Sequence, residues 1–140
     1  MSSKNHNENL AFLLARVAVG ISLFGHGVVR LPKAGAFSEW MRDRFEKNWL
    51  PAPVVGTFGY VLPWIEFGIG LLLIIGLFTR SALTGGAILM IVLIGGCCLI
   101  EDWSAIPSQL LHAGFCALLL IFVERYNYYS VDRRFLSDNP

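Results

Sequence analysis

Charged residues are scarce in this sequence, and they are unevenly spread. Only 15% of its 140 residues are Asp, Glu, Lys or Arg, against about 25% in soluble domains. Hydrophobic residues make up 55% of the chain, and the mean hydropathy is +0.59. Most charges lie in residues 30–47 and near the two ends. This pattern excludes an ordinary soluble domain and indicates an integral membrane protein, and the net charge of +1 gives no reason to expect a nucleic acid partner.

The long apolar blocks contain no alternation of polar and apolar residues, which excludes the strands of a membrane barrel. Four blocks, 10–31, 54–78, 81–100 and 106–123, have about the 20 residues that cross a bilayer as a helix. Backbone groups in lipid must bond within their own helix. We therefore predict an all-α integral membrane protein of one domain, residues 1–140, folded as an antiparallel four-transmembrane-helix bundle.

Cysteine is rare, and its distribution excludes a disulfide framework. Cys97, Cys98 and Cys116 all lie within predicted spans, and three is an odd number. Adjacent cysteines rarely direct both sulfur atoms at one ion, so we expect no metal site. The sequence also lacks a phosphate-binding loop, a Ser/His/Asp arrangement and a haem-attachment motif.

The connection between the first two spans predicts a further helix, over residues 36–49. Phe37, Trp40 and Trp49 lie on its apolar arc, and most of its charged residues lie on the other side. This pattern is typical of an amphipathic helix in the membrane interface, with tryptophans as anchors. Two readings stay open, a plain connector and a lid over a site below it.

Positive charges do not distinguish the two sides of the membrane. Five lie on the side of the termini and five on the other: Lys4, Arg80, Arg125, Arg133 and Arg134 against Arg30, Lys33, Arg42, Arg44 and Lys47. Because acids of the amphipathic helix offset several charges of the second set, we expect cytoplasmic termini. We place the protein in a bacterial inner membrane.

Arg16 and Glu66 are charged residues within otherwise apolar spans. Each shares a helical face with glycines, which allow close helix packing. At 1.5 Å per residue, Arg16 lies about 22 Å from the end of the first span, and Glu66 about 18 Å from the start of the second. We therefore predict that the two side chains pair between these helices, either only to fix helix packing or also to set the geometry of a site.

A second polar group is predicted at the end of the bundle near the long connection. Its members are His26, Arg30, Trp64, Cys97, Gln109 and His112. Arg30 and a protonated histidine would suit an anion. A histidine beside lipid would also bind a quinone carbonyl and pass a proton to it.

Two segments carry a resemblance to a known family. The segments LLARVAVGISLFGHGVVRL and PWIEFGIGLLLIIGLFTR, with the order of four spans, resemble the DoxX-like family of small four-helix membrane proteins. The resemblance covers roughly residues 10–125, and the family pattern falls on Arg16, Gly20, Gly27, Glu66, Gly70, Gly76 and Arg80. Arg30 stands where the family often has lysine, and the two cations differ as ligands.

This resemblance implies a function, because the family includes the DoxD membrane subunit of thiosulfate:quinone oxidoreductase. We expect a membrane oxidoreductase subunit that passes electrons from a small reductant, such as thiosulfate, to quinone. The expected catalytic residues are His26, Glu66 and His112, and the expected substrate-binding residues are Arg16, Arg30, Trp64, Cys97 and Gln109.

Expected partners are the lipid bilayer, a soluble or membrane redox partner and a second copy of the chain. Two other functions stay open. One is a non-enzymatic anchor or assembly subunit whose buried charges fix helix pairing, and the other is a carrier of a small solute or proton.

Overall fold

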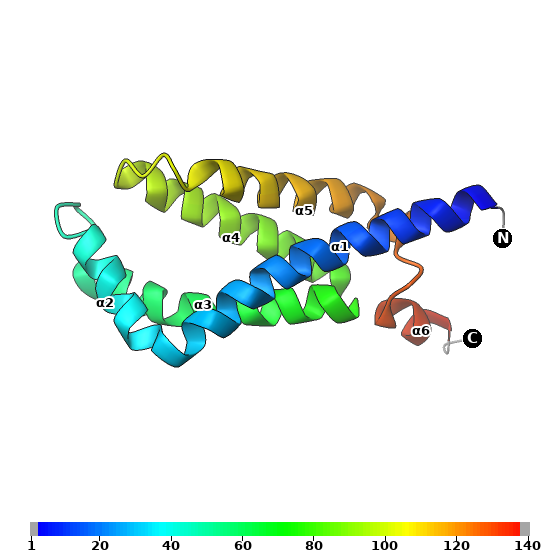
Figure 1. Cartoon of the computed structure of the whole chain (residues 1–140), viewed down its shortest axis with the longest axis horizontal. Coiled ribbons are helices and arrows are strands. Elements are labelled where there is room, and N and C mark those ends of the chain that lie inside the picture. Colours follow the sequence, from blue (N-terminus) through cyan, green and yellow to red (C-terminus); the bar gives the residue numbers. More distant parts are fainter. Residues whose placement is uncertain (1–2, 138–140) are drawn as a thin grey trace.

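The computed structural model describes residues 3–137, and every regular element in that range is a helix. The elements are α1 (Ser3–Arg30), a short 3-10 helix (Leu31–Lys33), α2 (Ala34–Arg44), α3 (Ala52–Ile75), α4 (Thr79–Leu99), α5 (Ile106–Tyr126) and α6 (Val131–Ser137) (Figure 1). Four helices, α1, α3, α4 and α5, are long and apolar enough to cross a membrane. The all-helical membrane class is confirmed. Residues 1–2 and 138–140 of the predicted domain lie outside the described residues.

Several helix boundaries differ from the predicted ones. Helix α3 ends at Ile75 because Gly76 has a left-handed backbone (φ 70°), a conformation that glycine adopts at little cost. The amides of Gly76 and Leu77 both donate to the Leu72 carbonyl, at 2.9 and 3.0 Å, and close the helix end. Helix α1 begins before residue 10, α2 ends well before residue 49, and α6 was not predicted.

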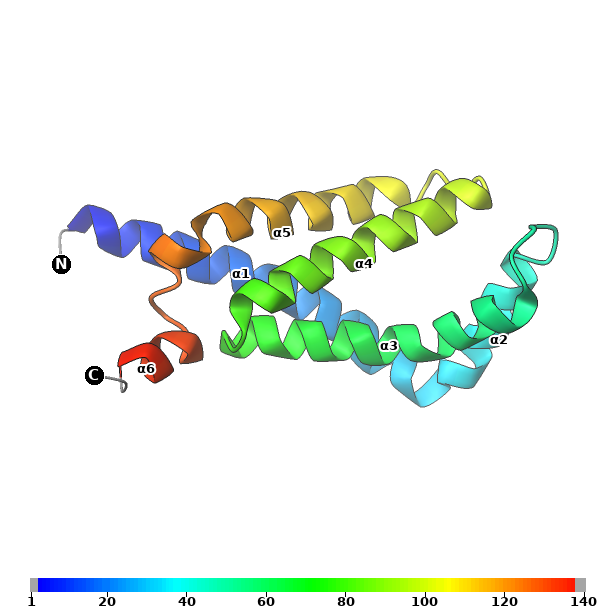
Figure 2. The same ribbon diagram turned by 180° about the vertical axis from the view of Figure 1, so that it is seen from behind.

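The spanning helices form two closely packed antiparallel pairs, α1 with α3 and α4 with α5. Figures 1 and 2 show α4 diverging from α3 away from their short link, towards the end of the molecule where α2 lies. The buried core between the helices includes Leu23, Leu62, Leu73, Leu83 and Leu119. The helices are therefore closest at the end with the termini and leave room at the other end.

Glycines bring α1 and α3 into backbone contact. A methyl group built on Gly27 would lie 2.5 Å from the Phe67 amide nitrogen, and one on Gly70 would overlap the Phe24 amide. Small residues permit this approach in membrane helices. These opposed pairs fix the antiparallel register of α1 against α3.

The first turns of α3 extend beyond the end of α1 and pack against α2. The Ser38 hydroxyl donates to the Gly56 carbonyl at 2.7 Å, and Gly59 lies against Ser38 and Met41. A helix is thus confirmed between the first two spans. Because it docks beside α3, the start of α3 is not level with the end of α1.

The outer faces of the spanning helices are apolar. Exposed side chains include Leu14, Ile21, Val29, Ile88, Ile91, Leu111, Leu118 and Ile121. Such faces suit contact with lipid, since bilayer tails solvate them as well as a protein core would. Trp64 belongs to this outer surface and is 57% exposed.

Candidate functional site

An ion pair joins the end of α1 to the middle of α3. Arg30 Nη1 lies 2.8 Å from both carboxylate oxygens of Glu66. The Glu66 side chain is 3% exposed and that of Arg30 is 28% exposed. The Arg30 guanidinium also lies 4.8 Å from the ring centre of Phe37 on α2. One cation therefore contacts three helices and holds the buried carboxylate.

The predicted pair between Arg16 and Glu66 is wrong, because the helix register places the two residues at different levels. Gly27 lies opposite Phe67, so Glu66 lies close to the last turn of α1. A Cβ atom built on Gly76 would instead overlap Arg16 Nη1, so Arg16 lies at the opposite end of α3. The depth estimate failed because it assumed that the end of α1 and the start of α3 lie at one level.

Arg16 is held by the segment after α5. Its side chain is 1% exposed. Nη1 donates to Asn127 Oδ1 at 2.6 Å, and Nη2 donates to the Tyr129 carbonyl at 2.8 Å. Asn127 in turn donates to Thr79 Oγ1 at 3.1 Å. These contacts give both terminal nitrogens of the buried cation neutral oxygen partners, while its buried Nε has none among residues 3–137. Arg16 thus ties α1 to the chain beyond α5 and lies apart from the predicted site.

Two histidines contact Ser22, and one of them, His112, connects α5 to α1. His112 Nδ1 lies 2.7 Å from the Ser108 carbonyl, and its Nε2 lies 2.7 Å from Ser22 Oγ. His26 Nδ1 lies 2.7 Å from the Ser22 carbonyl. A carbonyl only accepts, so each Nδ1 carries a proton. His112 Nε2 is therefore left for the Ser22 hydroxyl, while His26 Nε2 has no hydrogen-bond partner among the described residues.

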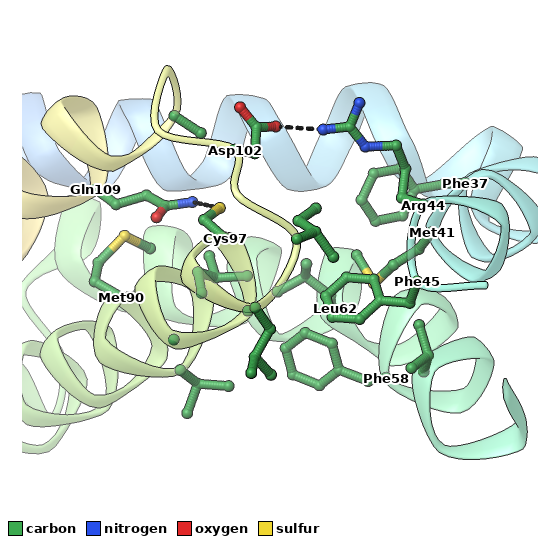
Figure 3. A pocket seen from close by; sticks show the side chains of 18 of the residues that line it. Phe37, Met41, Arg44, Phe45, Phe58, Leu62, Met90, Cys97, Asp102 and Gln109 are labelled. Carbon is green, nitrogen blue, oxygen red and sulfur yellow. Dashed lines mark hydrogen bonds and ion pairs between the residues drawn. The ribbon is translucent and has the colours of Figure 1, made fainter. Parts of the chain in front are cut away.

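A cavity of about 550 Å³ lies between the C-terminal part of α1, α2, α3, α4 and the start of α5. Its walls are mainly apolar, and Figure 3 shows Phe45, Phe58 and Leu62 meeting in it. Six of the eight predicted site residues line this cavity: His26, Arg30, Glu66, Cys97, Gln109 and His112. A volume of roughly 300–1,000 Å³ with few polar groups is usual for small-molecule sites. The structure brings these residues together, and their roles stay predictions.

Trp64 does not belong with them. It points away from the cavity on the outer face of α3, because Leu62 and Glu66 occupy the inward positions of this turn. The structure therefore does not bring Trp64 to this cavity with the other predicted site residues. Proximity to Glu66 along the sequence was misleading, since residues two apart on a helix face different ways.

Gln109 presents a buried acceptor beside the cavity. Its Nε2 lies 3.3 Å from Cys97 Sγ, a contact drawn in Figure 3. Its Oε1 is buried and has no hydrogen-bond partner among residues 3–137. A buried carbonyl without a partner is costly. A ligand with a hydroxyl group would supply the missing donor.

Two polar contacts join the end of α2 and the loop after it to the end of α4 and the α4–α5 link, beside this cavity. Arg44 Nη2 lies 2.7 Å from Asp102 Oδ2 (Figure 3), and Asn48 donates to the Leu99 carbonyl at 2.9 Å. Neither Arg44 nor Asp102 was predicted as a site residue from the sequence. Both are partly exposed, and a pair formed across the membrane surface leaves no pattern along the chain.

The fold and the cavity define a helical membrane protein with four spanning helices and a ligand-sized cavity at one end of them. Residues 11–100 match the DoxX family, and the chain belongs to this family. No curated protein and no solved structure matches the chain. The match ends at α4, so Gln109, His112 and the Arg16 partners lie beyond it.

Proposed function

We propose that the chain is the quinone-binding membrane subunit of an oxidoreductase, with the quinone head group in the cavity under α2. The observation that carries this proposal is the combination of aromatic and aliphatic walls with a few convergent polar groups, one of which is an unpartnered acceptor. Apolar walls suit a quinone ring, and the polar groups suit its two oxygen atoms.

The polar groups match both redox states of the ring. A quinone carbonyl accepts hydrogen bonds, and the amide nitrogen of Gln109 is a donor. A quinol hydroxyl donates, and Gln109 Oε1 is a free acceptor. His26 Nε2 would take up a proton from water and pass it to the ring, since Nδ1 is already held by the Ser22 carbonyl. The ion pair of Glu66 and Arg30 would hold one negative and one positive charge at a fixed place beside the ring.

Thiosulfate is the reductant we propose first, on the strength of the family resemblance and of the cations at the cavity. Two thiosulfate ions release two electrons as they join into tetrathionate, and quinone takes two electrons and two protons to become quinol. Arg30 and Arg44 line the cavity, each beside a carboxylate, and their remaining N–H donors would bind a sulfur oxyanion. We propose that a redox partner carries the electrons between the two reactants.

We further propose the placement of the chain in the membrane. The spanning helices would form an antiparallel four-helix bundle in a bacterial inner membrane, with cytoplasmic termini and α2 in the opposite interface. Exposed Trp40 on α2 and exposed Trp49 in the segment after it support this place for α2, because tryptophan prefers the interface. Helix α2 would then cover the cavity as a lid.

Quinone binding by the purified chain in detergent tests the proposed function. Gln109→Leu removes both hydrogen-bonding atoms of the amide, and we expect it to weaken decylubiquinone binding about tenfold, which is about 1.4 kcal/mol. Equilibrium dialysis measures the dissociation constant. Trp64→Leu is the matched control, because Trp64 lies outside the cavity, and it should leave binding unchanged.

The proposal fails if both variants bind quinone as the parent chain does, or if the parent chain does not bind it. The second result would favour an anchor or assembly subunit. Arg16 supports that alternative, because both of its hydrogen bonds, to Asn127 and Tyr129, hold α1 against the chain that follows α5.

A further inference from the structure

A second cavity lies at the other end of the spanning helices, next to the α3–α4 link. Its volume is about 1,010 Å³, and its walls come from the α3–α4 link, the end of α5 and the segment leading into α6. Leu77, Phe78 and Val123 form part of its apolar lining. These residues lie where the spanning helices begin and end. The cavity is therefore at the level where lipid head groups meet the acyl chains.

The charged groups of this cavity leave a positive excess. Three arginines, Arg80, Arg125 and Arg133, line it with two carboxylates, Glu124 and Asp132. Asp132 accepts from the amides of Phe78 and Thr79, at 2.7 and 2.8 Å, and Glu124 pairs with Arg80 at 3.3 Å.

Arg125 and Arg133 are the cations of this cavity that are left for a ligand. Within the described residues neither forms an ion pair, and both guanidinium groups lie over tyrosine rings, at 5.2 and 5.9 Å from the ring centres. They can therefore bind an anion without giving up a carboxylate partner.

A buried amide in this cavity requires a hydrogen-bond donor from the ligand. Asn9 on α1 lines it and is 6% exposed, and its Oδ1 has no hydrogen-bond partner among residues 3–137. An amide oxygen only accepts, so its partner must be a donor. A suitable occupant thus combines an anionic group with a hydroxyl or similar donor and an apolar body.

We infer that this cavity binds the head group of a hydroxylated anionic phospholipid of the phosphatidylglycerol type. Its single negative charge matches the one positive charge by which the arginines exceed the carboxylates. Its glycerol hydroxyl supplies the donor that Asn9 lacks, and its acyl chains meet the apolar lining. This inference does not depend on quinone binding, because the two cavities share no lining residue.

Native mass spectrometry of the full chain with added lipids tests the arginines. The double substitution Arg125→Gln and Arg133→Gln should reduce phosphatidylglycerol retention roughly tenfold, as the loss of two charge-assisted contacts requires. Arg134→Gln is the control, because Arg134 is exposed on α6 next to Arg133 but does not line the cavity. All three arginines are exposed, so folding should not be affected.

A change of lipid head group tests whether Asn9 accepts a hydrogen bond from the lipid hydroxyl. Phosphatidylmethanol has the same charge but no head-group hydroxyl, so the parent chain should retain it roughly fivefold less than phosphatidylglycerol. Asn9→Leu should remove this preference. Equal retention of phosphatidylcholine would overturn the inference, as would displacement of the lipid by inorganic phosphate, or an Arg134→Gln loss as large as that of the double variant.

Discussion

Arg30→Leu is expected to lower the free energy of unfolding by about 3–5 kcal/mol, the usual cost of leaving a buried charge without its partner. The Glu66 carboxylate is 3% exposed, and both of its oxygen atoms depend on Arg30 Nη1. The measurement is unfolding of the detergent-solubilised chain by sodium dodecyl sulfate, followed by circular dichroism. Arg80→Leu is the control, since Arg80 and Glu124 form an exposed pair worth at most about 1 kcal/mol.

A double-mutant cycle identifies the partner of Glu66. Arg30→Leu and Glu66→Leu should be strongly coupled, because the double variant removes both charges and leaves neither stranded. Arg16→Leu and Glu66→Leu should be additive, since Arg16 is bound to Asn127 and Tyr129. Coupling between Arg16 and Glu66, with none between Arg30 and Glu66, would refute the observed helix register.

Gly70→Ala is expected to cost about 3 kcal/mol, the upper end of the range for overpacking. The added methyl group would overlap the Phe24 amide and lie 2.7 Å from the Gly20 carbonyl oxygen. These are backbone atoms that cannot rotate away, so α1 must move off α3. Loss of helical signal on heating in detergent measures the effect.

Gly68→Ala provides the matched control on the same helix. A methyl group there has no heavy atom within 4 Å. Because alanine favours the helix over glycine by about 1 kcal/mol, this variant should be as stable as the parent chain or slightly more stable. Equal destabilisation by the two substitutions would contradict the close α1–α3 contact.

The spanning helices could be predicted from the sequence because hydropathy and the length of a bilayer crossing determine them locally. Their register could not be predicted in the same way. It depends on α2 packing beside the start of α3, through Ser38 and Gly56, which lets α3 extend beyond α1. The Arg16–Glu66 pair failed for this reason, although both residues were correctly expected to be buried.

The candidate site could be predicted in part. His26, Arg30, Cys97, Gln109 and His112 lie near helix ends on one side of the membrane, so their convergence follows from the order of the spans. Ser22, Asn127 and Asp132 were missed because small polar residues have no periodic pattern that marks a contact made across the fold. The buried charge of Arg16 required polar partners, but the sequence pattern indicated Glu66 instead of the segment after α5.

Photoaffinity labelling with an azidoquinone tests the central claim, that the cavity under α2 holds a quinone head group. Peptide mapping should place the label in the segments that line the cavity, within residues 37–45, 58–66 and 90–97. Excess decylubiquinone should suppress it, and Gln109→Leu should reduce it. Label confined to the outer faces of α4 and α5, unaffected by competitor or by Gln109→Leu, would contradict the claim.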